Sequence, residues 1–361
     1  MPATLLYERL KDRLHDVVPD AELRYKADLA DEINRLKAER DAVILGHNYM
    51  EPALYYSIAD YTGDSLELSR RAARTDKSVI VFCGVRFMAE TAKILSPDKT
   101  VLVPSERAGC SLAASITASD VRRLRERFPG VPIVAYVNTY ADVKAEVDVC
   151  CTSSNAVAVV NSLDSETVIF LPDEYLARNV ARETGRRIII ARPGGGAGAA
   201  VSVARDGEGR TDANGAGPRE PGPLIGWGGR CEVHERFTVG DILDVRRQFP
   251  DAVVLAHPEC SPEVVAASDF SGSTTALVRY VEQSPARRYL LLTECAMGDN
   301  VAAANPDKEM LRLCSVRCPH MNQITLEDTL EALRQMRYVV DVPEEIRLRA
   351  ARAVERMVAI G

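Results

Sequence analysis

The sequence predicts an α/β fold in which three related units, each with its own parallel sheet, surround one central site. Three observations support this prediction. Short β-branched runs alternate with amphipathic stretches along the chain, which is typical of parallel sheets with helices on their faces. Three of the runs end in similar polar residues, and the similar segments recur at intervals of nearly ninety residues. A repeat of that length indicates related structural units.

The individual elements follow from the periodicity of the apolar residues. Residues 4–18 form an amphipathic helical pattern, which we assign to an N-terminal helical extension over residues 1–22. We expect strands at 42–45, 78–82, 100–103, 132–137, 167–171, 187–191, 252–256 and 289–292. We expect helices at 119–128, 173–184, 239–249 and 326–337. Active residues in folds of this class gather beyond the carboxyl ends of the strands.

Three strand ends carry corresponding polar residues. They are Gly46-His-Asn-Tyr49, Tyr136-Val-Asn-Thr139 and Ala256-His-Pro-Glu259. Small polar residues follow each of them, at 63–65, 152–154 and 271–275, and a helical pattern comes next in each case. We therefore expect hydroxyl groups at three helix N-termini. The interval from Ser65 to Ser153 is 88 residues, and the interval from Ser153 to Ser273 is 120.

Three cysteines follow the same spacing. Cys110 and Cys231 lie 121 residues apart, and Cys231 and Cys318 lie 87 residues apart. Both long intervals contain residues 193–223, a segment of 31 residues rich in glycine, proline and charge that we interpret as a flexible surface insertion. Without it the two intervals become 89 and 90. A pseudo-threefold axis would then bring three cysteines and three sets of strand ends to one centre.

The repeat and the chain length together predict the domains. A chain of 361 residues exceeds the usual size of a single core. After the extension over 1–22, we expect one α/β domain from 23–108 together with 318–361, a second from 109–230 that contains the insertion, and a third from 231–317.

Composition excludes several classes of function. The chain is 46% hydrophobic and 27% charged, and its net charge of -7 gives no basic surface for nucleic acid. No stretch has the apolar character of a signal peptide or a transmembrane helix, so we expect a cytoplasmic protein without a membrane partner. Nine cysteines in such a protein are not expected to form a disulfide framework.

Three convergent thiolates suit few kinds of site. Zinc takes four protein ligands in structural sites and three with a water in catalytic ones. A [4Fe-4S] cluster held by three cysteines leaves one iron open as a Lewis acid. Radical enzymes would take their cysteines from one compact loop, whereas these span some two hundred residues. The segment Trp227–His234 alone is ambiguous, because its Cys-x-x-His could be half a zinc site, a nucleophile with its base, or a structural loop.

Polar residues around the expected centre offer anion binding and proton transfer. Helix N-termini with Ser65, Ser153 and Ser273 or Thr274 suit carboxylates or a phosphate, although such hydroxyls also serve as plain caps. His257 and Glu259 share one side of an extended segment, as do His47 with Tyr49 and Tyr136 with Asn138. A carboxylate beside an imidazole raises its basicity. The run Gly194–Gly198 lacks the residues of a phosphate-binding loop.

Several motifs make the chain resemble a known family. GHNYMEP, GDSLELSR, GVRFMAETAKIL, YVNTYADVKAEVDVCCTSSNAV, RCEVHERF, HPEC, SGSTT and CPHMNQITLEDTLEAL occur in this order between about Ala42 and Arg337. In these residues the chain is similar to the quinolinate synthases, iron–sulfur enzymes of de novo NAD synthesis. The resemblance implies a transferase with a three-domain α/β fold that condenses iminoaspartate with dihydroxyacetone phosphate to quinolinate, with loss of phosphate and two waters.

The resemblance also implies roles for individual residues. Cys110, Cys231 and Cys318 match the ligands of one [4Fe-4S] cluster. Tyr49 is similar to the catalytic tyrosine of the family, and we assign proton transfers to Tyr49, His257 and Glu259. Residues expected to bind substrate are His47, Ser65, Tyr136, Asn138, Ser153, His234, His257, Glu259, Ser273 and Thr274. Iminoaspartate is unstable in water, so functional coupling to the enzyme that makes it is expected.

Two other functions remain open at this point. A zinc-dependent aldolase or hydrolase could use the same three cysteines, and a non-catalytic module could bind a phosphorylated metabolite at the helix N-termini. The insertion at 193–223 departs from the family pattern. Cys314, four residues before Cys318, is either a spectator thiol or part of a redox-active pair with Cys318.

Overall fold

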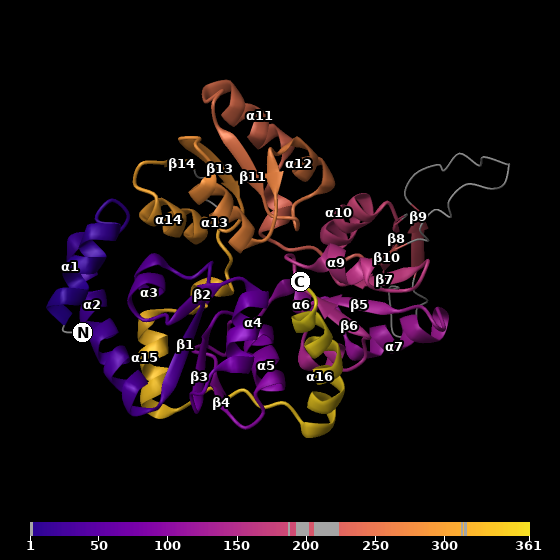
Figure 1. Ribbon diagram of the computed structural model, residues 1–361, viewed down its shortest axis with the longest axis horizontal. Coiled ribbons are helices and arrows are strands. Elements are labelled where there is room, and N and C mark those ends of the chain that lie inside the picture. The colour runs from indigo at the N-terminus through magenta and orange to yellow at the C-terminus, as the bar shows by residue number, and fades with distance from the viewer. Residues whose placement is uncertain (1–2, 187, 193–201, 206–223, 312, 314–315) are drawn as a thin grey trace.

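The computed structural model describes residues 3–186, 188–192, 202–205, 224–311, 313 and 316–361. They form three sheets flanked by helices, and Figure 1 shows the three sheets grouped around the middle of the molecule. The α/β fold class with three parallel-sheet units, predicted from the repeat, is confirmed. Within the described residues, no helix has the length and apolar character needed to cross a membrane.

The sheets share one strand order, in which the first strand lies between the second and the third. The first sheet has the order β2-β1-β3-β4, with β1 Ala42–His47, β2 Tyr61–Gly63, β3 Val79–Cys83 and β4 Thr100–Leu102. The third sheet has the order β12-β11-β13-β14, with β11 Val253–Ala256, β12 Phe270–Ser271, β13 Arg288–Leu292 and β14 Glu309–Leu311. All of these pairings are parallel.

The second sheet extends the same order by two strands. Its order is β6-β5-β7-β10-β8-β9, with β5 Ile133–Tyr136, β6 Val149–Cys151, β7 Val168–Leu171, β8 Ile188–Arg192, β9 Ser202–Arg205 and β10 Leu224–Trp227. The addition to the repeat therefore begins at β8, earlier than residue 193, and β9 pairs antiparallel with β8 at the sheet edge. The remainder of the predicted insertion, 193–201 and 206–223, lies outside the described residues.

Helices cover the sheets on the sides that carry apolar strand residues. Those around the first sheet are α1 Ala3–Leu14, α2 Asp20–Glu39, α3 Pro52–Ser57, α4 Ser65–Arg74, α5 Arg86–Leu95, α15 Leu326–Gln335 and α16 Glu344–Ala359. Those around the second are α6 Ser111–Ala114, α7 Ala118–Arg127, α8 Ala141–Lys144, α9 Ala156–Asn161 and α10 Glu174–Thr184. Those around the third are α11 Val239–Gln248, α12 Pro262–Ala267, α13 Thr274–Gln283 and α14 Cys295–Ala304.

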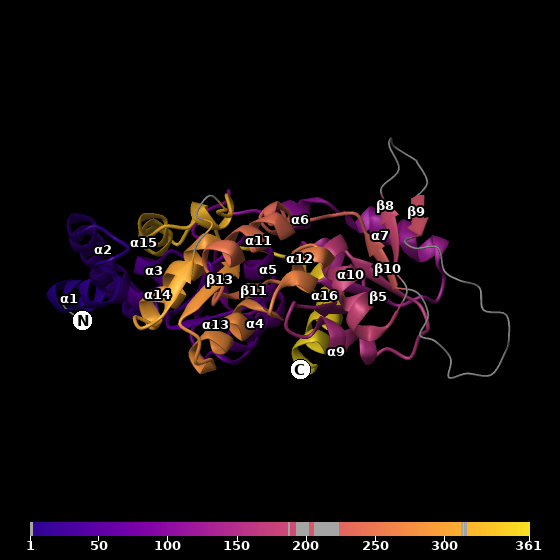
Figure 2. The same ribbon diagram turned by 90° about the horizontal axis from the view of Figure 1, so that it is seen from above.

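The C-terminal helix α16 lies between two domains. It packs against α5 of the first and against α8 and β6 of the second, and Figure 2 shows it near the middle of the molecule. One continuous apolar core accordingly runs through the first two sheets, whereas the third sheet has separate apolar clusters on its two faces. The domain boundaries drawn from the sequence remain predictions.

A repeated aspartate fixes the start of the first strand in each sheet. Asp60, Asp148 and Asp269 each accept a hydrogen bond of 2.8 Å from a backbone N–H of that strand. Each aspartate also forms an ion pair with a basic residue of the helix that precedes this first strand, namely Lys37 of α2, Arg125 of α7 and Arg246 of α11. The same polar device in three domains supports their origin as structural repeats.

The cysteine loops are repeated as well. Thr117, Thr238 and Thr325 each lie seven residues after one of the three cysteines. Each threonine caps a helix by accepting the N–H of an aspartate three residues further on. The helices α7, α11 and α15 therefore begin at equivalent points, because a Thr-x-x-Asp pattern satisfies the free N–H groups of the first turn.

Candidate active site

A cavity lies where the carboxyl ends of the strands of the three sheets meet. Register aligns the strand ends, with His47 opposite Gly63, Tyr136 opposite Cys151 and Ala256 opposite Ser271. The sequence-predicted residues that line the cavity are His47, Tyr49, Ser65, Cys110, Tyr136, Asn138, Ser153, Cys231, His234, His257, Glu259, Thr274 and Cys318. Ser273 lines a neighbouring cavity instead.

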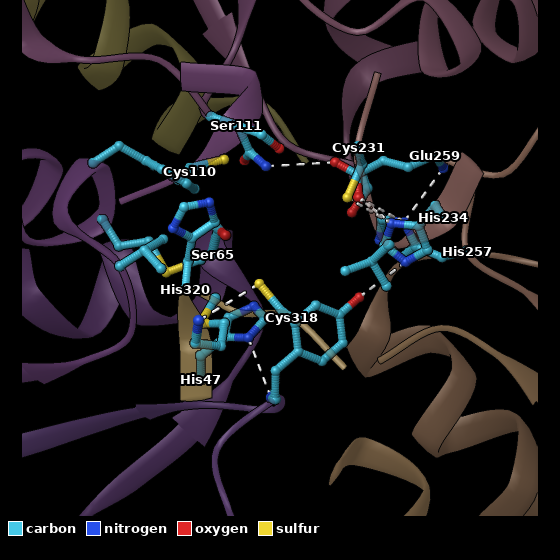
Figure 3. Close-up of a pocket in the computed structure, with 18 of the residues that line it drawn as sticks. His47, Ser65, Cys110, Ser111, Cys231, His234, His257, Glu259, Cys318 and His320 are labelled. Atoms are coloured by element: carbon cyan, nitrogen blue, oxygen red, sulfur yellow. Dashed lines mark hydrogen bonds and ion pairs between the residues drawn. The ribbon is translucent and has the colours of Figure 1, made fainter. Parts of the chain in front are cut away.

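The three cysteines approach the cavity from three loops. Cys110 follows β4, Cys231 follows β10 and Cys318 follows β14, and Figure 3 shows their sulfur atoms around one space. Burial raises the pKa of Cys110 to about 12 and that of Cys318 to about 11, and it raises the pKa of Cys231 as well. A neutral thiol is a poor ligand, so metal binding here would have to displace the protons.

His234 connects two acid–base groups on the third-domain side of the cavity. Its Nδ1 lies 2.7 Å from Glu259 Oε2, and its Nε2 lies 3.0 Å from Thr293 Oγ1. The Tyr49 hydroxyl lies 2.6 Å from the same Thr293 oxygen. Since Nδ1 donates to the carboxylate, Nε2 faces the Thr293 hydroxyl and can accept its proton when the ring is neutral. Protons can therefore pass from Tyr49 through Thr293 to His234, with Glu259 as the stabilising partner.

His47 and His257 have a different tautomer from His234. Nδ1 of His47 accepts the Tyr49 N–H at 3.2 Å, and Nδ1 of His257 accepts the Glu259 N–H at 3.3 Å. With Nδ1 as acceptor, the proton of each neutral ring lies on Nε2. Nδ1 of His257 is also 3.4 Å from Glu259 Oε2, but the carboxylate is closer to His234. The expected His257–Glu259 partnership is thus weaker than the unforeseen one between His234 and Glu259.

Burial keeps these imidazoles neutral and the phenols protonated. It lowers the pKa of His47 to about 4, and burial together with nearby His234 lowers that of His257 to about 3. Burial and the charge of Glu259 raise the pKa of Tyr49 and of Tyr136. Burial opposes ionisation of Glu259, but His234 outweighs it and lowers the pKa of that carboxyl. The cavity therefore offers neutral N–H and O–H donors around one carboxylate.

The hydroxyl groups meet at a shared aspartate. Asp64 caps α4 through Oδ1, and its Oδ2 accepts hydrogen bonds from Ser154 at 2.9 Å and Ser273 at 3.0 Å. Ser65 is the first residue of α4, and Thr274 is the first residue of α13. Ser153 does not lie at a helix N-terminus, because Asn155 precedes α9 and binds the Thr152 N–H. Two of the three expected positions are thus as predicted.

Comparison with known proteins identifies the family. A sequence profile described as "Quinolinate synthetase A protein" matches residues 31–359. The chain is 50% identical over 351 residues to Quinolinate synthase 2 of Mesorhizobium japonicum, covering 97% of both chains. It is 46% identical to Quinolinate synthase of Sinorhizobium medicae, covering 97% of this chain and 88% of the relative. It is 48% identical to Quinolinate synthase of Xylella fastidiosa, covering 94% of this chain and 89% of the relative.

The chain belongs to the quinolinate synthetase A family. The family match spans all three sheets and the residues that line the cavity. Cys314, considered as a possible redox partner of Cys318, lies outside the described residues. Cys318 itself accepts a hydrogen bond at Sγ from the Met321 N–H at 3.5 Å.

Cys231, His234 and Glu259 form a group that could hold a metal ion, and it shares Cys231 with the three cysteines. Ligand atoms of Cys231, His234 and Glu259 lie within 4.8 Å of one another. However, His234 Nδ1 is 2.7 Å from Glu259 and 3.2 Å from Cys231 Sγ. These contacts are typical of hydrogen bonds around one N–H, and a nitrogen that carries a proton cannot also ligate a metal. The arrangement is better suited to proton transfer than to holding an ion.

Sequence reasoning missed two buried residues at the end of β13. Thr293 connects Tyr49 with His234, and Glu294 accepts the Cys318 N–H at 3.4 Å and the Ala296 N–H at 2.6 Å. Burial raises the pKa of Glu294 to about 7. A signal was present, since polar residues directly follow an apolar strand here as they do after β1 and β11. Attention to the third strand of each repeat would have found them.

Proposed function

We propose that this chain is a quinolinate synthase, a transferase that condenses iminoaspartate with dihydroxyacetone phosphate and releases phosphate and two waters. The observation that carries the proposal is the meeting of three cysteines, one from each repeat, with a Tyr49–Thr293–His234–Glu259 relay in one cavity. The names of the relatives and the family match support the same function.

The donor set of the cavity fits an iron–sulfur cluster. Thiolates are the usual ligands of such clusters, and three thiols from separate loops line one space. Cys110, Cys231 and Cys318 would hold a [4Fe-4S] cluster. When bound, it would supply one iron without a protein ligand, which acts as a Lewis acid toward a substrate oxygen.

The side chains of the protein would bind and orient both substrates. Ser65, Ser153 and Thr274 offer hydroxyl donors from all three domains, and Ser65 and Thr274 are the first residues of α4 and α13. These groups suit the phosphate and carboxylates of the substrates. The Nε2–H groups of His47 and His257 would donate to further substrate oxygens. No basic side chain is needed, because neutral donors can hold an anion in a site that excludes water.

Tyr49 is suited to move protons at the reacting carbons. A buried phenol keeps its proton at neutral pH, so Tyr49 either donates this proton to substrate as an acid or passes it through Thr293 to His234 and then acts as a base. Glu259 stabilises the imidazolium that results. Asn138 donates to the other oxygen of Glu259 at 3.4 Å and helps to orient it.

The function is tested by anaerobic purification followed by iron, sulfide and quinolinate analysis. Wild type should contain four irons per chain, by the definition of the proposed cluster, and should form quinolinate from dihydroxyacetone phosphate and freshly generated iminoaspartate. Cys110→Ala, Cys231→Ala and Cys318→Ala should each abolish both properties. The matched control Cys83→Ala changes a buried thiol of β3 outside the cavity and should retain both. Full cluster content in the Cys318 variant would contradict this ligand set.

One observation favours a second candidate, a zinc-dependent aldolase or hydrolase. The close approach of Cys231, His234 and Glu259 gives sulfur, nitrogen and oxygen donors of the kind zinc accepts. Metal analysis separates the two functions. One zinc per chain without sulfide, together with metal loss in His234→Ala but not in Cys110→Ala, would replace the iron–sulfur proposal.

A further inference from the structure

Three buried side chains link the domains in a ring. Glu90 in α5, Asn179 in α10 and Asn300 in α14 are spaced by 89 and 121 residues, intervals close to those between the repeated serines and cysteines. Each lies on the helix that follows the third strand of its own sheet. Each also binds the backbone that follows the first strand of the next domain, as the hydrogen bonds below define.

Asn300 of the third domain holds the loop of Tyr49 in the first. Its Nδ2 donates to the carbonyl oxygens of Asn48 at 3.2 Å and Met50 at 2.9 Å, which flank Tyr49 on either side. Asn300 is only 4% exposed, so water does not compete for these bonds. Both N–H donors of the amide are used, and they fix the two peptide groups between which the tyrosine projects.

Asn179 of the second domain binds the loop of Glu259 in the third domain through two equivalent hydrogen bonds. Its Nδ2 donates to the carbonyl oxygens of Pro258 at 2.9 Å and Cys260 at 3.0 Å, on either side of Glu259. Asn179 is 1% exposed. Cys260 Sγ additionally donates to Leu292 O at 3.4 Å, directly before Thr293. The carboxylate of the relay is therefore positioned from a neighbouring domain.

Glu90 completes the ring with the opposite polarity. Its Oε2 accepts the Ala141 N–H at 2.8 Å, just after the loop that carries Tyr136 and Asn138. Its Oε1 is held by Arg86 at 2.9 Å. A side chain of the first domain thus binds the backbone of the second, one of the second binds the third, and one of the third binds the first. Side chains at one repeat position make all three contacts.

We infer that Asn179 and Asn300 are positioning residues that set the geometry of the Tyr49–Thr293–His234–Glu259 relay across domain boundaries. The relay joins Tyr49 of the first domain to three residues of the third, and the apolar cores of these two domains are separate. Tyr49 packs against apolar clusters of both domains, and the polar contacts fix the loops in addition. Displacement of a reacting group by about 1 Å can lower the rate about a hundredfold. The inference rests on the proposed function for its catalytic consequence, although not for the contacts themselves.

The test replaces each amide by a carboxyl group of the same shape. Asn300→Asp and Asn179→Asp lose both donors and face two carbonyl oxygens with an acceptor. We expect kcat per loaded cluster to fall about tenfold or more in each, with KM changed less than about threefold, since neither side-chain amide is itself hydrogen-bonded to a hydroxyl proposed to bind substrate. The matched control is Asn305→Asp, because Asn305 is buried next to the same helix but binds only Val301 O within it. It should keep kcat within about twofold of wild type.

A second readout does not depend on activity. Amide hydrogen exchange of residues 47–51 should become faster in Asn300→Asp, and that of residues 257–261 in Asn179→Asp, while Asn305→Asp leaves both segments unchanged. Wild-type kcat in both Asp variants, or equal losses in the Asn305 control, would overturn the inference. If an Asp variant does not fold, the corresponding Ala variant, which lacks the donors without adding a charge, is measured against the same criteria. Absence of quinolinate formation by wild type would refute the proposed function alone, and exchange would still decide whether the contacts hold the loops.

Discussion

The buried histidines at the ends of β1 and β11 are neutral in the folded protein. His47 and His257 are 4% and 3% exposed, and burial places their pKa values at about 4 and about 3. An unfolded histidine has a pKa near 6.5. Their neutral Nε2–H groups suit hydrogen bonds to anionic oxygens, so the cavity has donors that do not bring fixed positive charge.

This difference predicts how the stability depends on pH. Between about pH 6.5 and pH 4 the unfolded chain binds a proton at His47 that the native state excludes, so the free energy of unfolding falls as the pH is lowered. The slope is at most about 1.4 kcal/mol per pH unit for each such histidine. His47→Gln should show a shallower loss than wild type in urea titrations at pH 7 and pH 5. The exposed His15, replaced by Gln as a control, should leave the wild-type slope; a wild-type slope in His47→Gln would contradict the prediction.

Loss of one hydroxyl should separate chemistry from binding. Tyr49→Phe removes the proton that passes to Thr293 while it keeps the ring in place. We expect kcat to fall about 10²–10⁴-fold with little change in substrate affinity, measured by single-turnover assays and by equilibrium binding of dihydroxyacetone phosphate. Tyr289→Phe, which removes a hydroxyl bound to Ala286 O away from the cavity, should be nearly silent. Equal turnover in Tyr49→Phe and wild type would exclude the tyrosine from the chemistry.

At the scale of single residues, the sequence identified site residues better than it identified their hydrogen-bond partners. The i, i+2 relation correctly brought His47 to Tyr49 and His257 to Glu259, although each pair lies in a turn, closed by Met50 N–H to His47 O or by Cys260 N–H to His257 O, and not in the expected extended segment. It could not indicate that Glu259 would bind His234, 25 residues away, since this contact depends on how the β10 and β11 loops fold together. Thr293 is likewise brought to Tyr49 only by the packing of two domains.

At the scale of secondary-structure elements, the clearest repeated feature is the aspartate that directly precedes the second strand of each sheet: Asp60, Asp148 and Asp269. Asp269 accepts the Val254 N–H at 2.8 Å and pairs with Arg246 at 2.9 Å. Asp269→Ala leaves the strand N–H without this acceptor and should lower the free energy of unfolding by about 1–3 kcal/mol. Asp269→Asn keeps an acceptor oxygen and loses only a largely exposed ion pair, for a cost of about 0–1 kcal/mol. Urea midpoints measure both changes, and equal costs would show that the N–H bond is unimportant.

Element prediction succeeded where apolar runs were long and failed where they were short. Expected strands such as 42–45 and 252–256 agree with β1 and β11. The two- and three-residue strands β2, β6, β12 and β14 were not predicted, because so few residues show no periodicity and are held by pairing to a neighbour, whereas the three-residue β4 agrees with the strand expected at 100–103. The strand expected at 187–191 agrees with β8, whereas β9 was not predicted, and the place of both beyond β10 depends on pairing in the completed sheet.

At the scale of the whole molecule, the spacing of serines and cysteines was sufficient to predict threefold architecture. Equal intervals imply equal units, and equal units direct equivalent loops toward a common axis. The spacing could not predict the contacts between the units. Asn179, Asn300 and Glu90 occupy ordinary helix positions in sequence, and only the assembled domains give them backbone partners. The third domain differs from the others in having separate apolar clusters, and this difference also arises only when the chain packs.

The junction at Asp64 should therefore contribute more to stability than its size suggests. Ser273 caps α13 by accepting the Ala276 N–H at 3.3 Å, and it also donates to Asp64 of the first domain. Ser261 caps α12 with the same 3.3 Å bond and has no such second contact among the described side chains. Ser261→Ala should cost about 1 kcal/mol for the lost cap. Ser273→Ala should cost about 1–3 kcal/mol more, because it also removes a hydrogen bond to a buried carboxylate.

The same substitution should loosen the third domain against the first, since their apolar cores do not join. Thr274 adjoins Ser273, and Ser65 adjoins Asp64, so both hydroxyls proposed to bind substrate depend on the junction. KM for dihydroxyacetone phosphate should therefore rise in Ser273→Ala and stay at the wild-type value in Ser261→Ala. Urea unfolding and initial-rate kinetics measure the two effects independently. Identical stability losses and identical KM values in the two variants would show that Asp64 joins the domains without influencing substrate binding or the stability of the assembly.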